Sequence, residues 1–551
     1  MVSESPSGPS ARPHKPGAIK GERRRGEAAA LGRIWRLHFW VGLFAAPALI
    51  VLACTGLIIL YTQPLDLWLH RDLKVVAQTP SQVVLDTQVA TARAHVAPDM
   101  ILDAVTPPQA ADRSTQVDFL PAEEPEVGER NVTQVFIDPY TGSYLGQRQE
   151  LDGLVGWANQ LHRFFGNDGP TVALPSVGHF IAPTAYPDPS IRVGIGSLLI
   201  EMTAVWVLVL AASGIYLWWP RDTERGKPRL AIRWRRGGRV RWRDVHAATG
   251  ILLSVVLICY IVSGLTWSRY WGENWRAVAS TVTPSTAIDA PSTPAQLGDL
   301  DRLGRRIAWA DKEDPIYAST RSDPGAKTLG FQDIDQIAKS ENMIAGYSIM
   351  PPADSTDTDG GTVYGSYTVV NHWPQKLSEQ RSLYLNQFTG QTVANATADQ
   401  DGALSRITGW GIDMHMGTQY GIVTRILATA ACLGLLTSIG TAIAMWWKRR
   451  PAGGAGLPSR SSDTVRANTP PGAVTAIGVI ATALAVIYPS FGVTLLVVLI
   501  AEWIVASRRN RQRHDPPTSG TAADQPSGPR TGVDPVPAGH DAADDRRHIA
   551  G

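Results

Sequence analysis

The sequence predicts a polytopic α-helical membrane protein with two large α+β domains outside the bilayer and a C-terminal helical hairpin. Long apolar stretches, the placement of basic residues and an internal repeat support this prediction. Four stretches exceed the roughly 20 residues that cross a bilayer core, and we expect each to form a spanning helix. They are residues 34–62, 194–219, 246–268 and 419–447. A shorter apolar pair, interrupted at "YPSFG", predicts the hairpin at 473–506.

Total charge, the first apolar stretch and the cysteines exclude several classes of protein. The formal net charge is only +2 over 551 residues, which points to no nucleic-acid partner. The first stretch is too long for a cleavable signal peptide, so we expect it to remain as an anchor. Cys54, Cys259 and Cys432 all fall inside predicted helices. The loops therefore contain no disulfide framework, thiolate metal site or CxxCH motif, and any haem would be held without thioether bonds.

Basic residues indicate which segments face the cytoplasm. The loop at 220–245 holds ten Lys or Arg against three Asp or Glu, "GERRRG" precedes the first helix and "RRNRQR" follows the hairpin. By the positive-inside rule these segments are cytoplasmic. We therefore expect six crossings of a bacterial cytoplasmic membrane with both termini inside. The terminal segments 1–30 and 508–551, rich in Pro, Gly, Ser and charge, are predicted to be disordered tails.

This orientation places two long segments, 63–193 and 269–418, outside the cytoplasm. Each is long enough to fold around a core of its own. The stretches "VTQVFIDPYTGSYLGQ" and "SLYLNQFTGQTVANAT" each read as strand, turn and strand. We expect two extracytoplasmic α+β domains.

The two halves of the chain repeat one pattern of histidines and glycines. His38 stands in "LHFWVGLFAAPALIVLACTGL" and His246 in "VHAATGILLSVVLICYIVSGL", each with glycines four and eighteen residues later. Eighteen residues are about five helical turns, so the histidine and both glycines share a helix face. Further on, "GWANQLH" ends at His162 and "GWGIDMH" at His415. The repeated unit is therefore helix, outer domain, histidine and helix.

The repeat predicts one histidine pair in each leaflet. His38 and His246 begin helices at the cytoplasmic side, whereas His162 and His415 precede helices at the outer side. Two imidazoles facing each other in an apolar, glycine-lined bundle meet the requirement of a six-coordinate b-type haem. Zinc would need further ligands, and only Asp244 lies near the inner pair. The alternative, interfacial or helix-capping histidines, explains single positions but not four in register.

Three other residues have open roles. His179, in an insertion from about Asn167 to Ser190, and His372, in "VVNHWPQ", could line an outer substrate surface or replace a ligand. Glu201 lies inside the second predicted helix, where a carboxyl group is expected to face the bundle. It could bond a ligand, carry a proton or join helices.

Several short motifs resemble one known family. "RLHFWVGLF", "VFIDPYTG", "NQLHRFFG", "SGIYLWWPR", "DVHAATG" and "DMHMG" occur in this order between residue 31 and about residue 450. This set is similar to the PepSY-associated transmembrane family, which includes PiuB-like iron-regulated membrane proteins and FoxB-type ferric-siderophore reductases. The resemblance implies PepSY-like outer domains and two b-type haems. It places the haem-iron ligands at His38, His162, His246 and His415.

The resemblance implies a haem-dependent reductase that moves electrons across the membrane to a ferric siderophore or similar chelate. No dinucleotide fingerprint or flavin domain is recognisable, so the electron donor would be a quinol or a separate reductase. The alternative is a non-enzymatic PepSY membrane protein that binds or restrains an envelope protease. A chelate transporter is disfavoured, because the first four predicted spans lack charged or broken helices.

Overall fold

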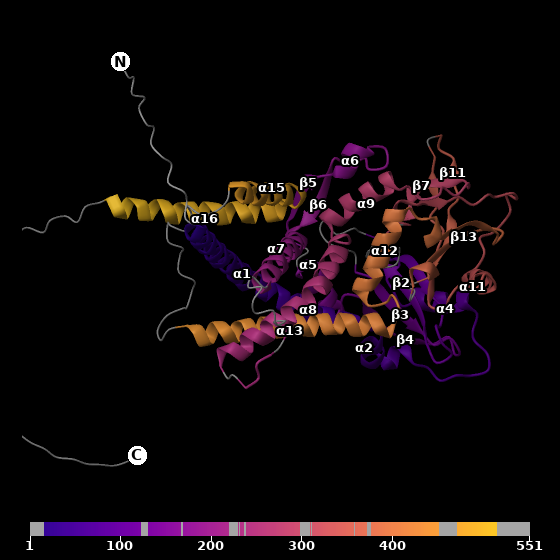
Figure 1. The fold of residues 1–551 in the computed structure, drawn as a ribbon. Coiled ribbons are helices and arrows are strands. Elements are labelled where there is room, and N and C mark those ends of the chain that lie inside the picture. The colour runs from indigo at the N-terminus through magenta and orange to yellow at the C-terminus, as the bar shows by residue number, and fades with distance from the viewer. Residues whose placement is uncertain are drawn as a thin grey trace, which may run out of the picture. The chain divides into compact units, whose positions relative to one another are not determined.

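The computed structural model describes residues 16–122, 131–166, 169–219, 230, 232–235, 238–297, 309, 311–357, 359–371, 376–450 and 471–514. Within them, four helices are long and apolar enough to cross a membrane. They are α1 (Pro16–Leu60), α7 (Ile195–Trp218), α8 (Arg239–Leu265) and α13 (Ile422–Arg449). Each overlaps a predicted span. Figure 1 labels the four helices and colours them in chain order. The prediction of a multi-pass membrane protein is confirmed at this level.

The helix ends differ from the predicted bounds in two places. Helix α1 begins at Pro16, so the second half of the segment predicted as an N-terminal tail is helical, and residues 1–15 lie outside the described part. Helix α8 begins at Arg239, inside the predicted cytoplasmic loop, most of which is also not described. Arginine is a good helix former, so a basic segment next to an apolar helix can continue that helix.

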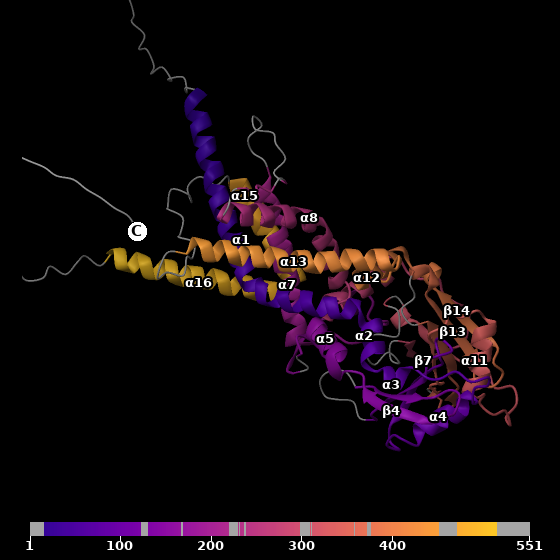
Figure 2. The same ribbon diagram turned by 90° about the horizontal axis from the view of Figure 1, so that it is seen from below.

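The four long helices pack as a bundle. Helix α8 lies against α13, α1 lies against α7, and the contacts α7–α8 and α1–α13 close the ring. Figure 2 shows α1 next to α13. Ala45, Leu49 and Val207 are buried at the centre, and their apolar neighbours come from α8 and α13. This layer separates the two ends of the bundle.

A helical hairpin follows the bundle in the chain. Its apolar stretches are shorter than the four candidate spans, so the six crossings expected from the sequence stay a prediction. The hairpin consists of α15 (Pro471–Ile487) and α16 (Pro489–His514), which flank Tyr488. The Phe491 ring packs against Trp206 of α7 at a tilt of 54° with ring centroids 4.7 Å apart, and the Trp206 indole N–H donates to Thr494 Oγ1 at 3.0 Å. Beyond Leu495 the chain forms a second unit, described as far as His514.

One antiparallel sheet of eight strands joins the two segments that were predicted to fold separately. Its order is β14-β13-β12-β9-β1-β2-β3-β4. The first segment contributes β1 (Ile101–Thr106), β2 (Thr115–Leu120), β3 (Thr133–Ile137) and β4 (Tyr144–Gln149). The second contributes β9 (Tyr347–Met350), β12 (Ser366–Asn371), β13 (Arg381–Asn386) and β14 (Thr392–Thr397). Val105 pairs with Ile349 where the segments meet, so the two share a fold.

The predicted strand–turn–strand motifs are confirmed as β3–β4 and β13–β14. Their Thr-Gly turns place Gly142 and Gly390 at φ angles of 70° and 71°, a conformation that glycine adopts without strain. The remaining elements connect the sheet to the bundle or lie on the sheet. They are α2 (Thr62–Leu69), α3 (Arg71–Lys74), α4 (Leu85–Arg93), α5 (Gly153–Phe164), β5 (Thr171–Pro175), α6 (Val177–Ile181), β6 (Ser190–Gly194), α9 (Tyr270–Val282), β7 (Ser292–Gln296), β8 (Pro315–Tyr317), α11 (Phe331–Ser340), β10 (Ser355–Thr356), β11 (Thr362–Val363) and α12 (Ala403–Met416).

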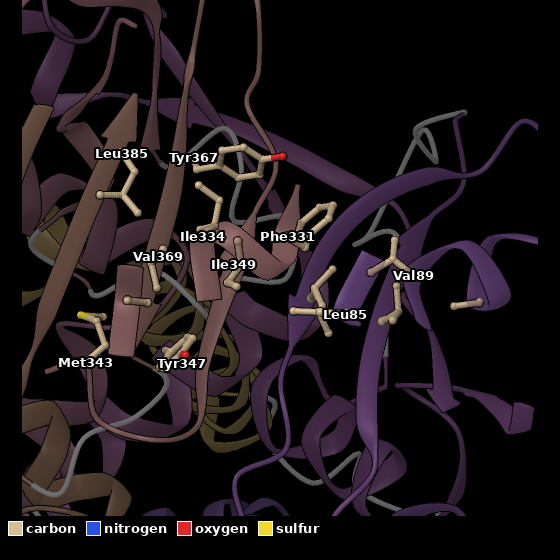
Figure 3. Close-up of a cluster of buried hydrophobic side chains, with 14 of the residues drawn as sticks. Leu85, Val89, Phe331, Ile334, Met343, Tyr347, Ile349, Tyr367, Val369 and Leu385 are labelled. Atoms are coloured by element: carbon tan, nitrogen blue, oxygen red, sulfur yellow. The ribbon is translucent and has the colours of Figure 1, made fainter. Parts of the chain in front are cut away.

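Helices α4 and α11 cover one face of the sheet and build its main core. Leu85 and Val89 of α4 and Phe331 and Ile334 of α11 pack on side chains from both segments (Figure 3). Asp86 of α4 accepts hydrogen bonds from the first two backbone N–H groups of α11, at 2.7 and 3.1 Å. The carboxylate therefore caps a helix of the other segment, which ties the two segments together.

The opposite face of the sheet differs between its halves. Under β12–β14, strands β7 and β8 supply Tyr317, which packs with Met350 and Tyr384 in a second apolar core. Under β2–β4, polar side chains such as Gln116 and Arg148 face a cavity instead. The first segment therefore leaves an open polar surface toward the bundle.

Asp311, beside β13, makes the stability of the sheet depend on pH. Burial, with the charges of Asp401 and Glu313 nearby, raises the pKa of Asp311 to about 7, above the roughly 3.9 of an unfolded chain. The contribution of Asp311 to the free energy of unfolding is thus fully present below about pH 4 and is lost as the pH rises through 7. We expect a melting temperature several degrees lower at about pH 8 than at about pH 6, and a smaller difference in Asp311→Asn. Thermal unfolding in detergent measures both, and an unchanged difference in the variant would contradict this assignment.

Candidate functional site

The four repeat-matched histidines form two pairs, one at each end of the bundle. His38 of α1 and His246 of α8, the distal pair, lie away from the sheet, and their ring centroids are 6.3 Å apart at 84°. His162 of α5 and His415 of α12, the sheet-side pair, line the cavity beneath the sheet. The structure thus brings His38 and His246 into ring contact and places His162 and His415 in the wall of one cavity.

The separation of the distal pair suits a shared metal ion. Metal–imidazole bonds of about 2.0 Å, together with the half-widths of two five-membered rings, give roughly 6 Å between the centroids of two imidazoles on one ion. Among the described residues, no group of three or more His, Cys, Asp or Glu could hold a metal ion. Asp244 pairs with Arg233 and Arg243 instead of facing His246. The donor set therefore fits a centre with two protein ligands, such as a bis-histidine haem.

Each histidine is held through Nδ1 by a hydroxyl group on a neighbouring helix. His38 Nδ1 lies 2.9 Å from Ser213 Oγ and His162 Nδ1 lies 3.0 Å from Thr55 Oγ1. In the second half, His246 Nδ1 lies 3.3 Å from Thr441 Oγ1 and 2.9 Å from the Ser438 carbonyl. His415 Nδ1 lies 2.8 Å from the Tyr260 carbonyl and 3.4 Å from Ser263 Oγ. One arrangement therefore occurs four times.

These contacts fix the protonation of the rings. Each hydroxyl donates its own proton to a backbone carbonyl of its helix, three or four residues earlier, so it accepts from the imidazole Nδ1–H. Carbonyl oxygens can only accept. The network therefore assigns the proton to Nδ1 and leaves an unprotonated Nε2 on each ring. An Nδ1–H bonded to oxygen with a free Nε2 is the usual state of a metal-ligating histidine.

Three of the four imidazole rings pack closely against glycines on neighbouring helices. A Cβ added to Gly264 would lie 2.8 Å from His415 Cε1, and one added to Gly56 would lie 3.3 Å from His162 Cε1. At Gly214 it would lie 3.2 Å from His38 Cε1. These glycines each follow the hydroxyl residue that binds the ring, so Thr-Gly or Ser-Gly marks the histidine contact. The Thr-Gly and Ser-Gly pairs are visible in the sequence, but spacing along the chain does not reveal that Ser213-Gly214 of α7 contacts His38.

The sequence places the repeat glycines on the same helix face as the histidine of their own helix, in a bundle that a flat cofactor could enter. The structure shows which side chains lie against them. Gly56 and Gly264 accommodate histidines of other helices, because α5 and α12 cross those points. Gly42 would meet only Leu210 at 3.6 Å, and Gly250 has open space around it.

Two other candidates, His179 and Glu201, do not join the pairs. His179 lies in α6, within the insertion, where its Nδ1 bonds the Tyr186 carbonyl at 3.1 Å; it is not among the described residues lining the cavity. His372 lies outside the described residues. Glu201 is fully buried and accepts the backbone N–H groups of Tyr270 and Trp271 at 2.9 and 3.2 Å. Glu201 therefore caps α9 and joins it to α7. Of the roles considered for Glu201, this is the joining of helices.

A cavity of about 1630 Å³ connects the sheet-side pair with the polar face of the sheet. Its bundle end is apolar, with Leu49, Val207 and Leu257 in the wall, and its sheet end carries Gln116 and Arg148. Typical ligand pockets measure roughly 300–1,000 Å³, so this one exceeds the space that a single small ligand needs. It offers both an apolar slot beside the histidines and a polar chamber above them.

The fold and the site define a multi-pass membrane protein in which a helix bundle carries four half-buried histidines below a β-sheet domain. Residues 35–449 match the model of the family described as the PepSY-associated TM region. The chain belongs to this family. No curated protein matches it.

Proposed function

We propose that the protein is a di-haem b reductase of the bacterial cytoplasmic membrane. It would transfer electrons across the membrane to an extracytoplasmic ferric chelate, such as a ferric siderophore, and so serve iron acquisition. The observation that carries this proposal is the repeated arrangement of two histidine pairs, each ring fixed through Nδ1 with Nε2 free. Two such pairs at opposite ends of one bundle suit electron transfer better than a purely structural role.

His38 and His246 would hold one haem, and His162 and His415 the other. A bound b-type haem supplies one-electron chemistry, because its iron is stable as Fe(III) and as Fe(II). The protein orients the four imidazoles, and its Nδ1 acceptors raise their basicity as ligands. Ala45, Leu49 and Val207 form an apolar layer between the two ends of the bundle.

The helix geometry sets the distance that electrons would travel. His38 and Gly56, which seats His162, are eighteen residues apart on α1, or about 27 Å at 1.5 Å per residue. This is close to the thickness of a bilayer core. The positive-inside rule places the distal pair near the cytoplasm and the sheet outside. A quinol or a separate reductase would supply electrons at the distal pair.

The cavity offers a place for the acceptor next to the sheet-side pair. A ferric chelate gains one electron there, which converts Fe(III) to Fe(II). The softer, less charged Fe(II) binds hard oxygen donors more weakly, so the metal is released without breaking the chelator. The protein needs no acid or base for this step, and its contribution is positioning.

Visible spectroscopy tests this function. Protein purified after haem-sufficient expression should show a Soret band and sharp α absorption on reduction, with about two haems per chain. Anaerobic mixing of the dithionite-reduced protein with a ferric chelate should reoxidise the haem and yield Fe(II), which ferrozine detects. Colourless protein, or reduced haem that ferric chelates do not reoxidise, would refute the proposal.

A further inference from the structure

Basic residues outnumber acidic ones in the wall of the cavity. Nine Lys or Arg and six Asp or Glu line it. Two of the basic residues, Arg113 and Arg276, pair with carboxylates outside the wall, Asp112 and Glu313, which leaves an excess of one positive charge among the described residues. The basic residues lie on both sides of the space, in the sheet domain and at the end of the bundle. A partly enclosed cavity with one sign of charge in excess concentrates ligands of the opposite sign.

On the sheet side, two cations share one carboxylate. Asp66 of α2 accepts from Arg148 at 2.5 and 3.2 Å and also pairs with Lys74. Burial alone would raise the pKa of Asp66, but Lys74 and Arg148 hold it below its ordinary value. The carboxylate is therefore ionised and neutralises only one of its two partners. Both cations lie against the Phe136 ring, at 5.5 and 5.9 Å from its centroid, and retain 22% and 17% exposure.

On the bundle side, Arg425 carries a charge that the described residues do not balance. It lies in the first turn of α13, half-buried, and lines the cavity. Its backbone adjoins Gly417, two residues after His415. No described residue pairs with its guanidinium group. Since an unpaired charge is unfavourable when partly buried, this position favours an anionic occupant.

We propose that the cavity selects an anionic ferric chelate, with carboxylate or similar negatively charged donors, held between Lys74 with Arg148 on the sheet and Arg425 on the bundle. The identity of the occupant as a ferric chelate rests on the proposed reductase function. The preference for negative charge rests on the cavity wall alone. Neutral chelates of the same size lack the charge that these three residues complement.

Gallium complexes test this preference without electron transfer, because Ga(III) matches the charge of Fe(III) and is not reduced by haem. The probes are gallium citrate, which is anionic, and neutral gallium tris-acetohydroxamate, each in equilibrium dialysis against the full chain in detergent. We expect the anionic complex to bind at least roughly tenfold more tightly. Lys74→Gln and Arg425→Gln should each weaken its binding roughly fivefold to tenfold and leave the neutral complex unaffected.

Arg71→Gln is the matched control. Arg71 lies on the same short helix as Lys74, but it is exposed and outside the cavity wall, so its loss should leave binding unchanged. Equal affinity for the two complexes, or unchanged citrate binding in both variants, would overturn the inference. The reductase function and the charge preference can fail separately. Colourless protein that still prefers gallium citrate would refute the reductase function and keep the charge preference. A coloured protein that binds both complexes equally retains only the function.

Discussion

Replacing His246 by alanine is expected to remove about half of the haem and to lower quinol-dependent ferric-chelate reduction by roughly a hundredfold or more. The substitution removes one of the two distal imidazoles, which lie 6.3 Å apart with no third donor among the described residues. His38 remains anchored to Ser213 but cannot supply both axial ligands. Haem per polypeptide, measured as the pyridine haemochrome, should fall from about two to about one.

The choice of electron donor localises this defect. The sheet-side pair is unchanged in His246→Ala, so protein reduced directly by dithionite should still reoxidise with a ferric chelate at close to the normal rate. His179→Ala is the control histidine, since its ring bonds the Tyr186 carbonyl and lies outside both pairs. It should retain both haems. If His246→Ala kept two haems, or lost dithionite-driven and quinol-driven activity equally, the assignment of the distal pair would be wrong.

The match between the histidines could be predicted from the sequence, but the hydroxyl groups that bind their rings could not. The match between His38 and His246, and between His162 and His415, depends only on spacing within a repeat. Their hydroxyl partners lie on other helices, and spacing along one helix does not reveal which helix lies beside it. For the same reason, the contact of Gly56 with His162 could not be read from the sequence.

The sequence pattern also could not predict that the two outer segments share one sheet. Alternating apolar and polar residues identified β3, β4, β13 and β14, but alternation does not specify the neighbour of an edge strand. The pairing of Val105 with Ile349 links residues far apart in the chain. Nor did the repeat predict that β7 and β8 cover only the second half of the sheet, which leaves the first half open to the cavity.

Gly264→Ala is expected to displace His415 and to weaken haem binding at the sheet-side pair by roughly tenfold or more. The new Cβ would lie 2.8 Å from His415 Cε1 and 3.3 Å from its Nδ1, closer than non-bonded carbon atoms approach. The ring is also held by the carbonyl of Tyr260 on the same helix, at 2.8 Å, so it cannot move away from α8 without losing the bond that fixes its tautomer. One methyl group should therefore perturb a ligand on another helix.

Two glycines provide a graded series for this prediction. At Gly56 the added Cβ would lie 3.3 Å from His162 Cε1, which a small shift can relieve, so Gly56→Ala should have a weaker effect. Gly250 is the matched control, because it lies on the same helix as Gly264 with nothing within 4 Å of an added Cβ. Haem content and the midpoint potential of the sheet-side haem should change in the order Gly264, Gly56, Gly250. Equal behaviour of Gly264→Ala and Gly250→Ala would show that the close approach of His415 to α8 has no part in cofactor binding, and the sheet-side site would need other ligands.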